Sequence, residues 1–343
     1  VANSWMQTPA GFHLVEHEGY MRAEVTDFWA MIFNPSTLPR LWHTLMGAFV
    51  VGAFFVMSVS AFYILKNRHV EFAKKSFTIA LVASLIYTIV LLPSADLMAR
   101  TVAFEQPEKL ATLEGVFETT EGPTPFTVFG IPNVKEKKLD FAVRIPYLLT
   151  FLVYRNFETP VQGRDNFPAD DLPPVWIPFT TYHIMIGLSL VFVGLSVLAC
   201  WFLWRGTLFR KRWLMWIFVF AVFLPFLANH SGWACAEVGR QPWIVWHLMR
   251  THDGISVTVP GSHVLGAILM FTAVYGMLFC AWLYVLHNKI MKGPMTVEEM
   301  EAAKKKRGIK GVIGERLAPE VHEMTEENGA AEQGENESGG PQS

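Results

Sequence analysis

A carboxylate and a guanidinium at the end of a long apolar run are the residues in this chain whose types and spacing first suggest chemistry. Glu237 and Arg240 close a run that begins near Trp213. An apolar run of roughly 20 residues predicts a membrane-spanning helix. A carboxylate close to bilayer depth is costly, and it predicts a functional site. The alternative is a structural ion pair, because residues three apart lie on one helical face.

Three further side chains in apolar runs could bind iron. His43 on an apolar helix is more often a hydrogen-bonded structural residue, but polar groups inside lipid are expensive. Histidine is a common axial ligand of haem iron, and a methionine partner raises the reduction potential. Met185 is one of 15 methionines, most of which we expect to fill gaps in the core. His183, two positions earlier, is the better ligand by chemistry alone, so these residues leave the choice between His183 and Met185 open.

Lys109 and Glu114 lie five apart in a polar stretch between two apolar runs. The residues alone favour a solvated helix face. The alternative is a site for a polar head group at the membrane surface. At such a site a carboxylate can accept a proton as a quinol gives up electrons.

The elements that must position these residues are long apolar helices. The chain has 343 residues, of which 52% are hydrophobic and 17% charged, which is a membrane composition. We therefore expect an all-α, polytopic membrane helical bundle with five transmembrane helices. The expected spans are 36–65, 76–99, 178–204, 213–238 and 263–286. In terms of segments, we expect an outer connecting segment at 1–35, two spans within 36–99, a long outer loop at 100–175, three spans within 176–290, and a charged, partly disordered tail at 291–343.

The 100–175 loop is too long for a tight connection, and loops of this size are usually functional or disordered. Within it, 126–132 and 141–154 are apolar enough to lie against the membrane surface. We expect the second of these to form an interfacial helix. In the tail, 297–306 could form a charged helix, and the last residues are polar enough for disorder.

Clusters of basic residues predict the orientation of the chain. They occur in the short loop after the first span, in the loop after the third, and after the fifth, at Lys289 and Lys292. Positive residues mark the cytoplasmic side, so the 100–175 loop would face outward and the C-terminus would be cytoplasmic. His43, Met185 and Glu237 would then share one level near the outer leaflet.

Several function classes lack support in the sequence. The net charge is −2, which gives no indication of nucleic-acid binding. The three cysteines lie in apolar runs without the spacing of a zinc site or a disulfide framework. Motifs for nucleotide hydrolysis, dinucleotide binding and zinc proteolysis do not occur. The first residue is Val1, with no charged segment typical of a signal peptide, and we expect the sequence to lack the N-terminal part of a longer protein.

Taken together, several segments in the right order resemble subunit I of the cytochrome bd quinol oxidases, from Val1 to about Lys292. The most specific is Gly239-Arg-Gln-Pro-Trp243. The others are Asn3-Ser-Trp-Met-Gln7, Trp42-His43-Thr44, Glu71 to Phe77, Lys109 with Glu114, Phe126 to Pro132, Glu158-Thr-Pro160 and His183-Ile-Met185.

The resemblance implies roles for the candidate residues. His43 and Met185 would be the axial pair of a low-spin haem b (b558), and Glu237 would ligate a high-spin haem b (b595). Trp233 and Arg240 would pack around the haems. Lys109 and Glu114 would belong to the quinol-binding outer loop, called the Q-loop. Many family members carry Arg where this chain has His183, so His183 remains a rival ligand for the low-spin haem.

The resemblance also implies a reaction and partners. Ubiquinol or menaquinol would be oxidised at the outer face of a bacterial cytoplasmic (inner) membrane. Electrons would pass through the haems b to haem d, where dioxygen is reduced to water without proton pumping. Subunit II would complete the complex, with a small single-helix subunit as a further candidate partner.

The family has nine spans, and five are predicted here. The four others, with the ligand of haem d, would precede Val1, and the fragment alone would be inactive. The alternative functions are a polytopic transporter or channel subunit and the dihaem membrane anchor of a dehydrogenase.

Overall fold

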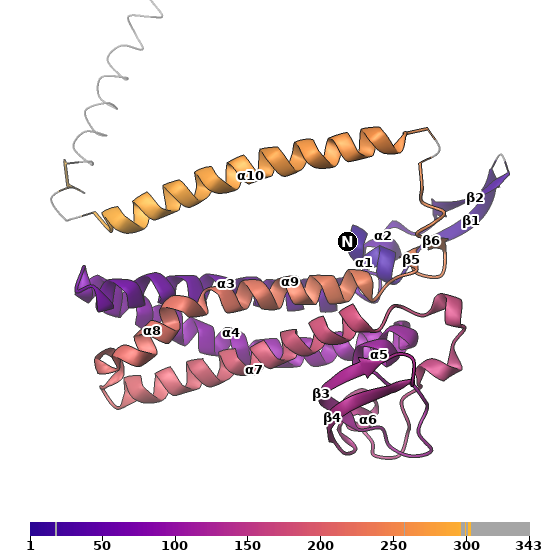
Figure 1. The fold of residues 1–343 in the computed structure, drawn as a ribbon, viewed down its shortest axis with the longest axis horizontal. Helices are drawn as coiled ribbons and strands as arrows, with labels where there is room; N and C mark the ends of the chain where they lie inside the picture. Colours follow the sequence, from indigo (N-terminus) through magenta and orange to yellow (C-terminus); the bar gives the residue numbers. More distant parts are fainter. Residues whose placement is uncertain (18, 257, 296–298, 300, 303–343) are drawn as a thin grey trace, which may run out of the picture. The chain divides into compact units, whose positions relative to one another are not determined.

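The computed structural model describes residues 1–302, apart from 18, 257, 296–298 and 300 (Figure 1). It confirms a helical fold in which five helical segments are long and apolar enough to cross a membrane. These are Phe28–Leu65, Val70–Glu105, Trp176–Trp204, Arg212–Val238 and Gly261–Lys292. The charged helix predicted at 297–306 and the rest of the tail lie almost entirely outside the described residues.

Four of these segments pack side by side in one bundle (Figure 1). The helix α3 packs on α4 and α8, and α7 packs on α4 and α9. A fully buried aromatic contact joins three of them: Phe218 lies 5.0 Å from Phe77 and 6.3 Å from Phe54, measured between ring centroids. The helices are α3 (Thr37–Leu65), α4 (Val70–Glu105), α7 (Trp176–Trp204), α8 (Arg212–Ala221) and α9 (Phe223–Val238). The fifth span is α10 (Gly261–Lys292).

The predicted helix over 213–238 is in fact two helices, because α8 ends at Ala221 and α9 begins at Phe223. Pro225 accounts for the break. It lacks the N–H that would bond to the Ala221 carbonyl, and its ring clashes with that group in a continuous helix. In contrast, α4 continues through Pro93 and is longer than the predicted span 76–99.

Short turns occupy one end of the bundle, and folded outer segments occupy the other (Figure 1). The turn between α3 and α4 contains Asn67 and His69 in the left-handed conformation. The basic loop between α7 and α8 contains the short 3-10 helix η3 (Leu208–Arg210) and lies at the same end. The basic turns and the folded segments therefore lie at opposite ends of the bundle, and which end faces the cytoplasm stays a prediction.

The long loop after α4 folds into several short helices and one hairpin. The helix predicted over 141–154 is wrong in its first part, because Phe141–Ile145 is strand and only Leu148–Tyr154 is helix. Pro146 explains the boundary, since the residue before a proline is disfavoured in the α conformation. The elements are α5 (Pro107–Glu114), the antiparallel hairpin β3 (Phe126–Asn133) with β4 (Lys138–Ile145), α6 (Leu148–Tyr154), η1 (Arg164–Asn166) and η2 (Ala169–Asp171).

The N-terminal segment, predicted as a simple connection, is also folded. Its short helix α1 is joined to the segment after α9 by a hydrogen bond from the Trp246 N–H to the Met6 carbonyl, 2.9 Å long. The elements are α1 (Ala2–Gln7), the antiparallel hairpin β1 (Phe12–His17) with β2 (Tyr20–Val25), α2 (Phe28–Ile32), and the later hairpin β5 (Trp243–Val245) with β6 (Met249–Arg250). Consequently α1 lies where it can contact the last turn of α9.

Candidate functional site

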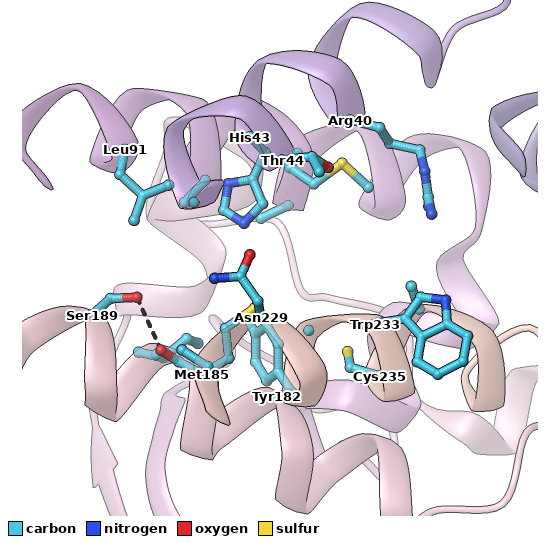
Figure 2. A pocket seen from close by; sticks show the side chains of 18 of the residues that line it. Arg40, His43, Thr44, Leu91, Tyr182, Met185, Ser189, Asn229, Trp233 and Cys235 are labelled. Atoms are coloured by element: carbon cyan, nitrogen blue, oxygen red, sulfur yellow. Dashed lines mark hydrogen bonds between the residues drawn. The ribbon is translucent and has the colours of Figure 1, made fainter. Parts of the chain in front are cut away.

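A cavity of about 300 Å³ opens between five helices near the folded end of the bundle (Figure 2). Small residues recur at every fourth position of α9, at Ala228, Gly232 and Ala236. The face of α9 toward the cavity therefore carries small side chains. The lining residues come from α3 (Arg40, His43, Thr44, Gly47, Val50), α4 (Leu91, Ala95, Met98, Ala99, Val102), α5 (Lys109, Leu110, Leu113), α7 (Tyr182, Met185, Ile186, Ser189, Phe192) and α9 (Ala228, Asn229, Gly232, Trp233, Cys235, Ala236).

His43 extends from α3 into this cavity (Figure 2). Its Nδ1 lies 3.3 Å from the Ser94 hydroxyl, and that hydroxyl donates its own hydrogen to the Leu91 carbonyl over 2.7 Å. The Ser94 oxygen can therefore only accept a hydrogen from Nδ1. This arrangement leaves the lone pair of Nε2 available, which is the tautomer that a metal-binding histidine needs.

Met185 lines the opposite wall of the cavity, on α7 (Figure 2). Its sulfur sits against Gly232, where a Cβ atom would lie only 2.8 Å from Sδ. A glycine at this point of α9 leaves room for the thioether.

His183 does not line the cavity, although it is only two residues from Met185. Its ring nitrogens lie 2.8 Å from the Phe179 carbonyl and 2.9 Å from the Thr127 carbonyl. The second contact joins α7 to β3 of the outer loop. In this arrangement His183 connects α7 to β3, and both ring nitrogens already contact backbone carbonyls.

Glu237 ends α9 on a side that does not line the cavity. Its two carboxylate oxygens accept hydrogen bonds of 2.7 Å, one from Asn3 of α1 and the other from Arg240. The Asn3 amide oxygen in turn accepts from Arg40, at 2.5 Å. The predicted Glu237–Arg240 ion pair is therefore present, within a network that also includes α1 and α3.

Arg240 is 6% exposed, and its Nε and Nη1 have no hydrogen-bond partner among the described residues. Buried donors without partners are costly, so these two nitrogens point to a missing acceptor. Arg40 and Lys109 add positive charge nearby, since both interact electrostatically with Arg240. Trp233 lines the cavity but is 67% exposed, so it stands at the edge of the site.

Lys109 and Glu114 are buried, which contradicts a solvated helix face. Lys109 is 2% exposed and Glu114 is 1% exposed. Burial lowers the pKa of Lys109 to about 7. The Lys109 ammonium donates to the Gln7 side chain and to the Ala236 carbonyl, both at 2.9 Å.

Glu114 does not line the cavity itself, but it is hydrogen-bonded to Tyr182, which does. The Tyr182 hydroxyl donates to Glu114 Oε1 over 2.6 Å, while Oε2 is buried with no partner among the described residues. Burial raises the pKa of Glu114 to about 8, and the hydrogen bond from Tyr182 opposes part of that rise. A carboxyl group with such a pKa can hold or release a proton near neutral pH.

Sequence reasoning missed the residues that support the candidate ligands. Nothing in the sequence identified Ser94 as a partner of His43, because a lone serine in an apolar span is common. Tyr182 could have been noticed, because it lies three residues from Met185 and therefore on a neighbouring part of the same helical face. Gln7 belongs to a segment that carries the resemblance, but no role was predicted for it or for Gln106. Asn229 lies between His43 and Met185 in the cavity, in the stretch that the sequence had singled out (Figure 2).

The residues fit a haem better than a bare metal ion. Among the described residues, no group of three or more His, Cys, Asp or Glu side chains lies together as a metal site. A haem needs only one or two protein ligands, here an imidazole and a thioether from opposite walls. The small residues of α9 leave room for a planar group, and the unpartnered Arg240 nitrogens suit carboxylate substituents. Glu237 retains lone pairs beyond its two hydrogen bonds, so it could still bind a metal.

The chain is similar to known proteins of one family. The sequence profile of cytochrome bd terminal oxidase subunit I matches residues 1–294. The chain is 34% identical over 301 residues to cytochrome bd ubiquinol oxidase subunit 1 of Bacillus subtilis (strain 168), covering 85% of this chain and 64% of the relative. It is 27% identical over 362 residues to cytochrome bd-II ubiquinol oxidase subunit 1 of Escherichia coli (strain K12), covering 87% of this chain and 70% of the relative.

A second Bacillus subtilis (strain 168) relative, a putative cytochrome bd menaquinol oxidase subunit I, is 35% identical over 298 residues, covering 84% of this chain and 64% of the relative. The chain thus spans 64% of the length of both Bacillus relatives. Among solved structures, the bd oxidase from Geobacillus thermodenitrificans superposes with a TM-score of 0.74 at 28% identity, covering 85% of this chain and 66% of that one.

Proposed function

Because this chain belongs to the cytochrome bd terminal oxidase subunit I family, we propose that it is the haem-binding part of a membrane quinol oxidase. The complex would oxidise a quinol at the outer face and reduce dioxygen to water. The family match favours this function over a transporter subunit or a dehydrogenase anchor. The prediction that haem d has its ligand outside residues 1–343 stays a prediction.

One observation carries the proposal: His43 and Met185 come from different helices and line opposite walls of a single cavity (Figure 2). The Ser94 hydroxyl fixes the His43 tautomer, and Gly232 makes room for the Met185 sulfur. A low-spin haem b would be held between them, and when bound it supplies one-electron transfer. Apolar side chains around the cavity limit water access, which affects the reduction potential of such a site.

The polar groups at the end of α9 would hold the second haem b. In this proposal Glu237 is its iron ligand, and Asn3 fixes the orientation of that carboxylate by a 2.7 Å hydrogen bond. Arg240 would pair a haem carboxylate through the two nitrogens that lack a partner among the described residues. Trp233, at the exposed edge of the cavity, would pack against the haem pair.

The quinol would be oxidised next to α5, where Glu114 acts as the proton acceptor. Oxidation of a quinol releases two electrons and two protons. A proton arriving at the Tyr182 oxygen from the cavity side can be passed to Glu114 Oε1, because the Tyr182 hydroxyl already donates to that atom. The raised pKa of Glu114, about 8, suits a group that takes up a proton and releases it again near neutral pH.

The proposal extends to the setting of the protein. The basic turns would be cytoplasmic and the α5 region would face outward, in a bacterial cytoplasmic membrane. A subunit II partner would complete the complex. Ubiquinol and menaquinol are both candidate substrates, because the names of the relatives include both.

Optical spectroscopy of the intact complex purified from membranes tests the proposal. Reduction with dithionite should reveal haem b bands, and the His43→Ala variant should lose the low-spin band because the cavity loses its only imidazole among the described lining residues. His230→Ala is the matched control, since this exposed α9 histidine does not line the cavity and its ring nitrogen bonds to the Phe226 carbonyl of its own helix. A colourless wild-type complex, or an unchanged spectrum in His43→Ala, would contradict the proposal.

A further inference from the structure

Lys109 borders the cavity, and its ammonium lies in a polar junction between α1, α5 and α9. Its ammonium contacts Gln7 Oε1 at 2.9 Å, the Ala236 carbonyl at 2.9 Å and, more weakly, Gln106 Oε1 at 3.5 Å. An ammonium group has three hydrogens and no acceptor. All three hydrogens therefore have protein acceptors, and a quinol oxygen could bind Lys109 only by displacing one of them.

The acceptors are themselves linked to one another. Gln7 Nε2 donates to the Ala236 carbonyl at 3.2 Å, and Gln106 Nε2 donates to the Gln7 side-chain and backbone oxygens at 3.1 Å. Gln7, Gln106 and Lys109 are each no more than 2% exposed. A fully paired and fully buried network fixes the relative position of its members, because breaking any bond leaves a buried group unsatisfied.

The junction is built onto the turn of α9 that carries Glu237. Ala236, whose carbonyl Lys109 holds, immediately precedes Glu237. Asn3, on the same short helix as Gln7, donates to the Glu237 carboxylate. Gly239 leaves room for the Lys109 stem, since a Cβ there would lie 3.1 Å from Lys109 Cε. Hydrogen bonds from α1 and α5 therefore fix the backbone of this turn at Ala236, and a hydrogen bond from α1 fixes the Glu237 side chain.

We propose that Lys109 is a positioning residue for Glu237, coupling the quinol-side helix α5 to the haem-bearing end of α9. The inference rests on the proposed function, in which Glu237 ligates the high-spin haem b. It differs from the predicted role of Lys109 as a quinol contact, because the Lys109 ammonium acts through Gln7 and Ala236 and not through the substrate.

The test uses the intact complex with Lys109→Met, which keeps most of the stem and removes the ammonium. Dithionite reduces the haems without quinol, so the spectrum reports on haem binding alone. We expect the high-spin haem signal to weaken or shift while the low-spin signal stays. Lys74→Met is the control, because this lysine is 40% exposed and pairs with Glu71 on its own helix, at 3.0 Å.

A second readout measures the protein itself and not a haem band. Cys235 is 5% exposed and lies directly before Ala236. Its labelling by a maleimide, located by peptide mass analysis, should be slow in the wild type and several-fold faster in Lys109→Met, because the turn is released. Gln7→Met removes the acceptor shared by Lys109 and Gln106, so it should also alter the high-spin haem signal and speed the labelling of Cys235. This variant provides the test if Lys109→Met does not assemble.

A wild-type spectrum and a wild-type labelling rate in Lys109→Met, together with a raised KM for quinol, would overturn the inference and assign Lys109 to the substrate. An unchanged spectrum and labelling rate in Gln7→Met would overturn it as well. Failure of the proposed function itself looks different, because the wild-type complex would then show no haem bands.

Discussion

The cavity between α3, α7 and α9 and the junction beside α5 are built in opposite ways. In the cavity, His43 and Met185 lie on opposite walls, with the Asn229 side chain between them. In the junction, the Lys109 ammonium donates to Gln7, Gln106 and Ala236, so each of its three hydrogens already has an acceptor.

The difference separates binding from positioning. A cavity lined by candidate ligand atoms on opposite walls is suited to binding a further group between them. A network whose members are paired with each other needs no ligand, and its value lies in the geometry that it imposes. The buried Glu114–Tyr182 pair is intermediate, because one carboxylate oxygen is bonded and the other has no partner among the described residues. Five predictions test this contrast.

The largest effect is expected for the choice of iron ligand on α7. Met185→Leu should abolish the low-spin haem band, because leucine has a similar volume but no donor atom. His183→Ala should leave the band in place, since both ring nitrogens are turned to backbone carbonyls. Dithionite-reduced spectra of the two variants provide the measurement, and the opposite pattern would make His183 the ligand.

His183→Ala should instead weaken the attachment of β3 to α7. The Thr127 carbonyl would lose its partner, at a cost of about 1–2 kcal/mol for a buried acceptor. Hydrogen exchange in β3 and β4 would report the loosening. Unchanged protection would show that the contact contributes little.

The next effect concerns the carboxylate at the quinol side. Glu114→Gln keeps the shape and hydrogen-bonding capacity but cannot accept a proton, so we expect quinol oxidation to fall by about 10²-fold. The dithionite-reduced spectrum should stay unchanged, because Glu114 does not line the cavity. Glu158→Gln, at a carboxylate in the same outer loop whose backbone N–H bonds to Asn156, is the control. Loss of a haem band in Glu114→Gln would show that its role is structural.

A smaller effect should follow from filling the space beside the Met185 sulfur. In Gly232→Ala the new Cβ would lie 2.8 Å from Sδ, so the thioether must move. We expect a shifted or weakened low-spin band. Gly187→Ala is the matched control, because a Cβ at that position of α7 meets nothing within 4 Å. Identical spectra would mean that the sulfur is not held at a defined position.

The smallest effect is a pH dependence. A proton acceptor must be deprotonated, and the pKa of Glu114 is about 8, so the quinol oxidation rate should rise roughly tenfold from pH 7 to 9 and then level off. Tyr182→Phe removes a hydrogen bond that lowers this pKa, so the rise should move to higher pH. Steady-state rates with quinol in excess measure both profiles, and a rise that persists in Glu114→Gln would assign it to another group.

Hydropathy alone predicted the helical bundle well, because long apolar segments have few ways to satisfy their backbone in lipid. The five spans are found where they were predicted, within several residues at each end. The errors occurred where local composition was ambiguous. Strand β4 was read as part of a helix, and the break before Pro225 was read as continuous.

The sequence determined by itself that buried polar residues would lie on membrane helices, and it singled out His43 and Glu237 because such residues are expensive in lipid. Only the tertiary structure decided which neighbours face the cavity. His183 and Met185 differ by about 200° around α7, which puts one on the outer hairpin and the other on the cavity. Lys109 looked solvated because its acceptors lie 102 and 127 residues away, at Gln7 and Ala236. Burial of that kind depends on contacts between distant segments, which local sequence patterns do not report.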